Sequence, residues 1–147
     1  MNKIFLVIAA IFFYSCSYTP MMVGKNYNFK FDIINTNGEK EINKIIKQKL
    51  VKKSEGEKVY NINFTTKKEK LTISSNKKGD PTVFELRVNL NYEIYNKNGL
   101  LNKNIIEKKV TYNNVKDKFE LLKYEENIIK SLSENISEEI LRSTSSL

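Results

Sequence analysis

The side chains that usually carry out protein chemistry are scarce in this sequence of 147 residues. It contains no histidine, a single cysteine and five glycines that stand singly. These absences exclude histidine-centred catalytic triads, histidine or thiolate zinc sites, and glycine-rich phosphate loops. Serine, lysine and carboxylate side chains are plentiful, but no serine lies in a nucleophile-type turn, and the acidic residues fall mainly on predicted solvent-facing helix faces. We therefore predict a protein that is not an enzyme and that has no catalytic or metal-binding residues.

The single cysteine, Cys16, follows a segment typical of a signal peptide. Met1–Lys3 is a short basic start, and residues 4–14 form an apolar run that is too short to span a bilayer as a helix. The pair Ser15–Cys16 that follows resembles a bacterial lipobox. That resemblance implies cleavage before Cys16 and attachment of lipid to its thiol and its new amino group. The alternatives are an ordinary secretory signal with an incidental cysteine, or an uncleaved anchor.

On the lipoprotein interpretation, residues 1–15 are the signal peptide and residues 16–26 are the lipidated cysteine with a short tether. The covalent lipid on Cys16 is then the only added group, and we expect no cofactor. Two or more acyl chains hold a protein at a membrane almost permanently. Because Ser17 rather than aspartate follows the cysteine, the resemblance to bacterial lipoproteins implies the outer membrane, reached through the periplasm.

The chain is basic, with a net charge of +8, and nearly all of its cations are lysines: only 2 of the 25 are arginine. A basic surface suits nucleic acid, anionic lipid or an acidic partner. Lysine, asparagine and isoleucine also have A/T-rich codons, so genome composition is an equal explanation of the charge. Nucleic-acid sites favour arginine, and an export signal conflicts with such a partner. We therefore expect no nucleic-acid binding.

Hydrophobic spacing predicts the elements of the first half of the folded part. Residues 27–33 alternate with period two and predict a strand, and residues 35–38 form a turn cluster. Apolar residues at helical spacing predict an amphipathic helix over residues 39–53. The alternation over residues 59–65 predicts a second strand. It resumes at Leu71, which suggests a bend or bulge near Lys67.

The second half begins with the most regular alternation of the chain, over residues 83–95. A turn at residues 96–99 leads into a fourth strand over roughly 104–112. A final helix over residues 119–141 begins at a capping box formed by Asp117 and Glu120.

The resulting order, β-α-β-β-β-α, predicts a single α+β domain over residues 27–143, with a frayed tail at 144–147. A right-handed crossover makes the first two strands parallel, and the last three strands form an antiparallel meander. The economical arrangement is a two-layer sandwich, in which a four-stranded mixed sheet carries both helices on one face. The other face is then uncovered and polar, and along the third strand it presents Glu85, Arg87, Asn89 and Asn91. Simple solvent exposure, and pairing of Arg87 with Glu85 or Glu93, are the alternatives to an interface.

The element order resembles the LPS-assembly lipoprotein family, LptE, over nearly the whole chain. The most specific stretch is Val110-Thr111-Tyr112-Asn113-Asn114, which precedes an acidic amphipathic final helix. A lipid-linked cysteine, a short tether and an aromatic first strand also match the family.

The resemblance implies a complex with the large outer-membrane β-barrel that transports lipopolysaccharide (LPS), the LptD type. The protein would plug the barrel lumen, assist its assembly and help to deliver LPS to the outer leaflet. A polar sheet face suits a polar lumen, so Glu85, Arg87, Asn89 and Asn91 are the barrel-interface candidates. By the same resemblance the LPS-binding candidates are Lys77, Lys78 and Lys130. For Lys77 and Lys78, the alternative is two ordinary turn lysines in a lysine-rich chain.

Two other binding roles compete with this one. An auxiliary lipid-binding lipoprotein of an ABC-type envelope transport system would need an apolar groove between helices and sheet. A regulatory lipoprotein that contacts a peptidoglycan synthase would need a long tether to cross the periplasm. The short segment over residues 17–26 argues instead for a partner at the membrane itself.

Overall fold

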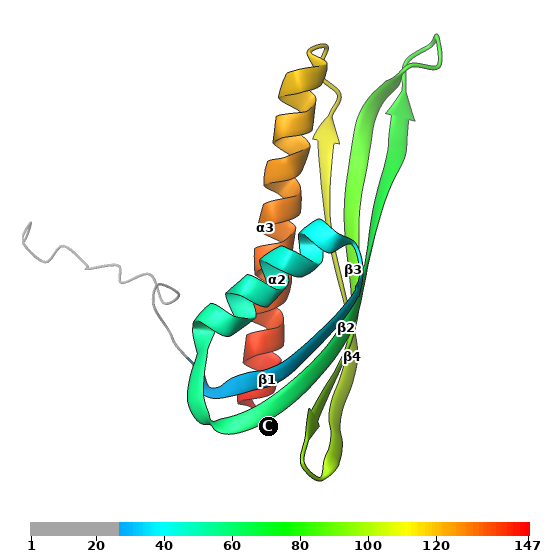
Figure 1. Cartoon of the computed structure of the whole chain (residues 1–147). Helices are drawn as coiled ribbons and strands as arrows, with labels where there is room; N and C mark the ends of the chain where they lie inside the picture. The colour runs from blue at the N-terminus through cyan, green and yellow to red at the C-terminus, as the bar shows by residue number, and fades with distance from the viewer. Residues whose placement is uncertain (1–26) are drawn as a thin grey trace, which may run out of the picture.

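A computed structural model describes residues 27–147, which form six elements in the predicted order (Figure 1). They are β1 (Tyr27–Gly38), α2 (Lys40–Lys53), β2 (Ser54–Ser75), β3 (Pro81–Asn96), β4 (Gly99–Asn113) and α3 (Lys118–Ser145). The predicted signal peptide, Cys16 and the tether lie outside the described residues.

The four strands form one mixed sheet in the order β1-β2-β3-β4. β1 is parallel to β2, and the β2–β3 and β3–β4 pairs are antiparallel. Both helices lie on the same face of this sheet (Figure 1). The predicted α+β class, with four strands and two helices in a two-layer arrangement, is therefore confirmed. Within residues 27–147, no helix combines the length and apolar character that crossing a membrane requires.

The buried core lies between the helices and one sheet face. On β3, the alternate positions from Phe84 to Ile94 all point into this core, as the period of two predicts. The helices contribute side chains at helical spacing, and the most deeply buried are Ile42, Ile46, Leu50, Ile136, Ile140 and Leu141. Each helix therefore buries one stripe and leaves its charged side exposed.

The connection from β1 to α2 differs from the predicted turn at residues 35–38, because these residues continue the strand to Gly38. Thr66 of β2 organises this end of β1. Its hydroxyl oxygen accepts a hydrogen bond from the Glu39 amide at 3.0 Å, and its hydroxyl donates to Asn43 Oδ1 at 2.7 Å. Residues 35–38, which are typical of a turn, therefore form the end of β1 here. The hydrogen bonds of Thr66 hold the start of α2 next to that end.

The bulge that we expected near Lys67 is absent, and this part of the prediction is wrong. The register of β2 against β3 is regular at Lys67 and shifts only between Thr72 and Ser75. Leu71 therefore pairs with Glu85 on the face away from the helices and is 39% exposed, and Ile73, which lies within the shift, is 54% exposed. A bulge does occur in β1, between Phe31 and Ile33.

The remaining boundaries also differ from the predicted ones. The bulge in β1 turns Ile33 outward and lets Ile34 pack against the core. β4 starts at Gly99, directly after a two-residue turn, rather than near residue 104. Asp117 caps α3 by accepting hydrogen bonds from the amides of Phe119 and Glu120. α3 runs to Ser145, past the predicted helix end at residue 141 and into the predicted tail at 144–147, because Thr144 is buried and helical.

Candidate interaction surface

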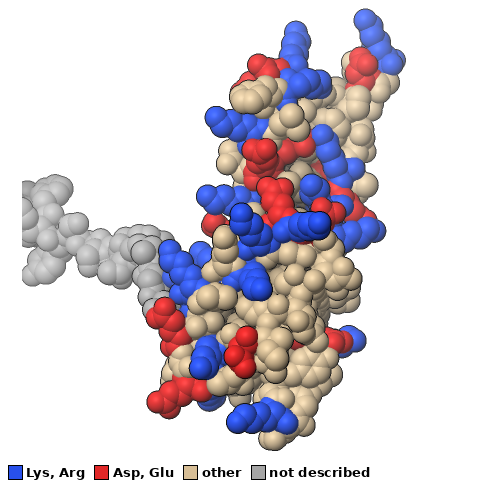
Figure 2. Space-filling model, viewed as in Figure 1, with Lys and Arg blue, Asp and Glu red and all other residues tan. Residues whose placement is uncertain are grey.

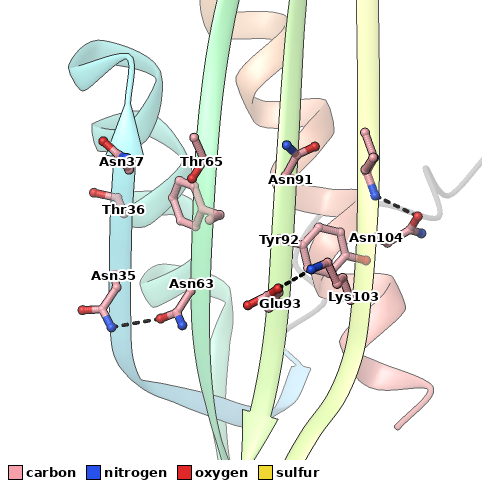
Figure 3. Close-up of a pocket in the computed structure, with 12 residues that line it drawn as sticks. Asn35, Thr36, Asn37, Asn63, Thr65, Asn91, Tyr92, Glu93, Lys103 and Asn104 are labelled. Carbon is pink, nitrogen blue, oxygen red and sulfur yellow. Dashed lines mark hydrogen bonds and ion pairs between the residues drawn. The ribbon is translucent and has the colours of Figure 1, made fainter.

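The face of the sheet opposite the helices, which we call the outer face, carries the four predicted interface residues. Glu85, Arg87, Asn89 and Asn91 occupy alternate positions of β3, and the positions between them are buried against the helices. Figure 3 looks onto this face, with the helices behind the strands. The sequence therefore placed these residues on the correct side of the sheet. It left open whether Arg87 pairs with Glu85 or Glu93, or with neither.

Arg87 and Glu85 form an ion pair across one face of β3. Arg87 Nη2 lies 2.7 Å from Glu85 Oε1, and Lys109 Nζ of β4 lies 3.6 Å from Glu85 Oε2. The second carboxylate near Arg87 is Glu107, whose Oε1 is 3.8 Å from Arg87 Nε. That Nε is buried and has no hydrogen-bond partner among the described residues. Of the alternatives for Arg87, the structure therefore shows the pairing with Glu85.

This pair keeps fixed charges on the outer face. The hydrogen bond from Arg87, helped by the charge of Lys109, lowers the pKa of Glu85 below its ordinary value. The hydrogen bond to Glu85 and the charge of Glu107 raise the pKa of Arg87. Any partner that covers this face therefore meets a carboxylate and a guanidinium that already neutralise one another, so the desolvation cost is smaller than for free charges.

A shallow depression of about 420 Å³ crosses all four strands of the outer face (Figure 3). Its rim is rich in amides, and Asn35 Nδ2 of β1 donates to Asn63 Oδ1 of β2 at 2.9 Å. The polar side chains that line it are Asn35, Asn37, Asn63, Thr65, Asn91, Glu93, Lys103 and Asn104, next to the exposed side chain of Ile105.

Glu93 provides the charged corner of this depression. Lys103 Nζ lies 2.7 Å from Glu93 Oε1, and the hydroxyl of Tyr95 donates to Oε2. The hydrogen bond from Lys103, followed by that from Tyr95, lowers the pKa of Glu93. Amides that both donate and accept, beside a fixed ion pair, suit a polar hydrogen-bonding surface. They do not form a nucleophile or a poised acid–base pair.

Sequence reasoning missed Asn35, Asn63 and Lys103 as members of this surface. The alternation of Asn61 and Asn63 with buried residues was a usable signal on β2. The alignment of Asn35 with Asn63, however, depends on the extension of β1 to Gly38 and on its register, and neither is visible in composition.

The predicted LPS-binding lysines do not form one cluster. Lys77 and Lys78 are exposed at the tip of the β2–β3 hairpin, where Asn76 Oδ1 accepts hydrogen bonds from the amides of Lys78 and Asp80. Figure 2 shows basic side chains gathered at this tip and beside the upper part of α3. Lys130 lies 12 residues after Lys118, the start of α3, which is about 18 Å further along the helix axis. The structure therefore separates Lys130 from the hairpin tip.

A polar contact links three elements behind the hairpin, on the inner face of the sheet. Glu125 Oε1 of α3 accepts a hydrogen bond from the Tyr112 hydroxyl at 2.7 Å and lies 2.6 Å from Lys70 Nζ. Burial and the hydrogen bond to Glu125 raise the pKa of Tyr112. The same ammonium group lies 4.2 Å from the centre of the Phe84 ring. This contact fastens the first half of α3 to the sheet, so we assign it to stability.

No protein family and no curated protein sequence matches the chain. Solved structures do. The rare lipoprotein B from Shewanella oneidensis has a TM-score of 0.60 at 15% identity, over 78% of this chain and 95% of that one. Lipoprotein B from Nitrosomonas europaea has a TM-score of 0.61 at 19% identity, over 84% of this chain and 88% of that one. Residues 27–147 therefore have a fold that is shared with solved bacterial lipoproteins.

Proposed function

We propose that this chain is a lipid-anchored envelope protein that plugs an LPS-transport β-barrel of the LptD type in the outer membrane. In this role it helps to assemble the barrel and assists the insertion of LPS into the outer leaflet. The role is non-catalytic and needs no cofactor beyond the covalent lipid on Cys16. The fold shared with bacterial lipoproteins and the lipobox-like Ser15–Cys16 pair support the anchored part of the proposal.

The observation that carries the barrel role is the uncovered outer face. Its amides and paired charges extend over all four strands, and they are arranged to exchange hydrogen bonds with a wet, polar wall. The lumen of a large outer-membrane barrel is such a wall. An antiparallel sheet tolerates one solvated face, so exposure is the simple alternative, and an experiment must separate the two.

The lysine pair at the hairpin tip supports contact with LPS. Lys77 and Lys78 are exposed side by side, and ammonium groups bind phosphate as point charges. The turn that carries them is held by Asn76. The tip therefore presents two cations on a fixed loop at the far end of the longest strand, where a phosphate-bearing headgroup can approach.

The competing role as a carrier for an ABC-type system receives less support. It requires an apolar groove between the helices and the sheet. The middle of that space is filled by side chains of almost zero exposure, including Ile46, Leu90 and Ile136. A depression of about 570 Å³ between β4 and the first half of α3 is lined mainly by polar side chains, such as those of Asn113 and Lys123. The packed inner face and the open outer face together favour a protein that binds through its sheet surface.

The test is a pull-down from detergent-solubilised envelope, with a tagged chain in which Cys16 is intact, followed by mass spectrometry. We expect a stoichiometric large β-barrel. An Asn63→Lys, Asn91→Lys double variant adds two charges to the outer face and should reduce barrel recovery at least tenfold. A Gln48→Lys, Asn135→Lys double variant adds the same two charges to the exposed sides of α2 and α3, and it should leave barrel recovery unchanged. Recovery of an ABC transporter or a peptidoglycan synthase without a barrel would overturn the proposal.

A further inference from the structure

Within residues 27–147, part of β2 has no neighbouring strand on one side, because β2 is much longer than β1, the strand beside it. The pairing of the two strands ends at Gly38 and Thr66, whereas β2 continues to Ser75. Residues 67–73 of β2, which we call the distal edge, therefore have β3 on one side and no strand among the described residues on the other (Figure 1). Such an edge presents a row of backbone donors and acceptors to a further strand.

The end of β1 is fixed, so β1 cannot extend to fill this position. Gly38 has a φ of +92°, and a β-carbon at this position would collide with the carbonyl oxygen of Thr66. The Thr66 hydroxyl then binds the Glu39 amide and the Asn43 side chain, so α2 begins directly after the strand. The position beside the distal edge is therefore empty because the chain turns away at Gly38, and not because the end of β1 is frayed.

Exposed apolar side chains flank the distal edge on both faces of the sheet. Leu71 lies opposite Glu85 on the outer face and is 39% exposed, and Ile73 is 54% exposed. On the inner face, Lys70 contacts Glu125 of α3. Leu122 lies one helical turn before Glu125 and is 59% exposed, and its neighbour Phe119 is 75% exposed. A strand added at this edge would have apolar surface available on either side of it.

The charges along the distal edge select what can be added. Lysines on an edge usually repel further strands, but here Lys67 lies 2.7 Å from Glu69 and Lys70 lies 2.6 Å from Glu125. Lys68 is exposed and forms no ion pair within the part of the chain that the structure describes. The preferred occupant therefore carries a carboxylate opposite Lys68.

We propose that the distal edge accepts an extended segment of another polypeptide as a fifth strand, with side chains that alternate between apolar and acidic. Backbone hydrogen bonds supply the attachment. The carboxylates lie opposite Lys68 on the inner face, so the apolar positions lie on the outer face beside Leu71 and Ile73. A second copy of this chain fits less well, because its own distal edge has Glu69 as its only acid, already paired with Lys67.

The test uses the full-length chain in detergent micelles with two capped ten-residue peptides, one alternating valine with glutamate and one alternating valine with lysine. Hydrogen exchange, read by mass spectrometry, should slow in residues 67–73 when the glutamate peptide is added. Fluorescence anisotropy should give at least tenfold weaker binding for the lysine peptide. Lys68→Glu should reduce or reverse this preference.

Ile73→Lys should weaken binding of the glutamate peptide at least tenfold, because it replaces an apolar contact at the edge by a charge. Leu100→Lys is the matched control, since Leu100 is 53% exposed but lies in β4, and it should leave binding unchanged. Equal loss in both variants, protection away from residues 67–73, or no protection would overturn the inference. So would a concentration-dependent dimer that protects the same residues without peptide. Barrel recovery in the pull-down is a separate readout. If the peptide fails to bind but the barrel is still recovered, the edge proposal is wrong and the proposed function stands.

Discussion

Tyr112, near the end of β4, donates its hydroxyl hydrogen to Oε1 of Glu125 in α3 over 2.7 Å. The pair is shielded, since Tyr112 is 5% exposed. Lys70 binds the same carboxylate oxygen from β2. One atom therefore joins two strands and a helix at the place where the sheet extends beyond α2.

Tyr112→Phe should lower the free energy of unfolding by about 1–2 kcal/mol, because the hydrogen bond it removes is made to a charged acceptor in a shielded place. Urea denaturation measures the change. The control is Tyr124→Phe, because Tyr124 packs against Tyr112 but is half exposed, and it should cost less than about 0.5 kcal/mol. Equal losses in the two variants would show that the hydroxyl of Tyr112 contributes nothing specific.

The stability of the domain should fall at acid pH. The partners of Glu85 and Glu93 hold the pKa values of both carboxyls below the ordinary 4.5. The unfolded chain then binds protons more readily than the folded one, so their contribution is complete above about pH 4.5 and disappears as the pH falls through the lower folded values. Urea unfolding between pH 7 and pH 3 should show this decline.

Glu85→Gln should partly flatten this acid dependence, because it removes one of the three carboxyls within residues 27–147, with Glu69 and Glu93, whose pKa is lowered in the folded chain. Glu57→Gln changes an exposed glutamate at the start of β2 and should leave the acid dependence as it is in the parent chain. If both variants kept the full dependence, the ion pair between Glu85 and Arg87 would have no part in acid unfolding.

Gly38→Ala and Gly79→Ala should differ sharply, although both glycines have a positive φ near 90°. At Gly79 a β-carbon would meet nothing within 4 Å, so only backbone strain remains, at a cost of about 1–2 kcal/mol. At Gly38 it would collide with backbone atoms of Thr66 as well, and we expect a loss above about 3 kcal/mol. Thermal and urea unfolding measure both. Similar losses would contradict the tight fit between β1 and β2.

On the proposed function, Lys77→Glu with Lys78→Glu should weaken LPS binding about tenfold at low salt, which corresponds to 1.4 kcal/mol. The loss should shrink as salt is added, because exposed charges are screened. Lys97→Glu is the control, since Lys97 is an exposed lysine in the β3–β4 turn at the other end of the sheet. Binding that is insensitive to the hairpin lysines, or equally sensitive to Lys97, would remove the site from the tip.

The sequence predicted β3 almost completely and parts of its neighbours poorly, for one physical reason. Every second residue of β3 from Phe84 to Ile94 has a core to enter, so the alternation follows the structure. At Leu71 and Ile73 the same reasoning assumed that apolar residues must face the core, and it required a bulge. The inner positions before Leu71 are instead occupied by Lys68 and Lys70, of which Lys70 binds Glu125 in α3, and the strand continues in register as far as Thr72.

On the outer face, too, the positions along one strand were predictable, whereas the pairing between strands was not. The interface positions on β3, such as Arg87 and Asn91, follow from alternation alone. The depression that joins Asn35 to Asn63 requires knowledge of which residues stand opposite each other on neighbouring strands. Register of this kind is decided by the bulge at Ile33 and by the extension of β1 to Gly38, and both depend on tertiary contacts.

The length of α3 sets the distance between the two ends of the molecule. Its 28 residues span about 42 Å, close to the full thickness of a lipid bilayer with its headgroups, roughly 40–45 Å. Tyr27, where the described chain begins, lies beside Thr144 and Ser145 at one end of this helix. Asn114, just before the helix starts, bonds to Pro81 and Thr82 at the base of the lysine hairpin. If the N-terminal end is anchored at one leaflet and α3 lies along the bilayer normal, the lysine hairpin would therefore lie at the level of the other leaflet.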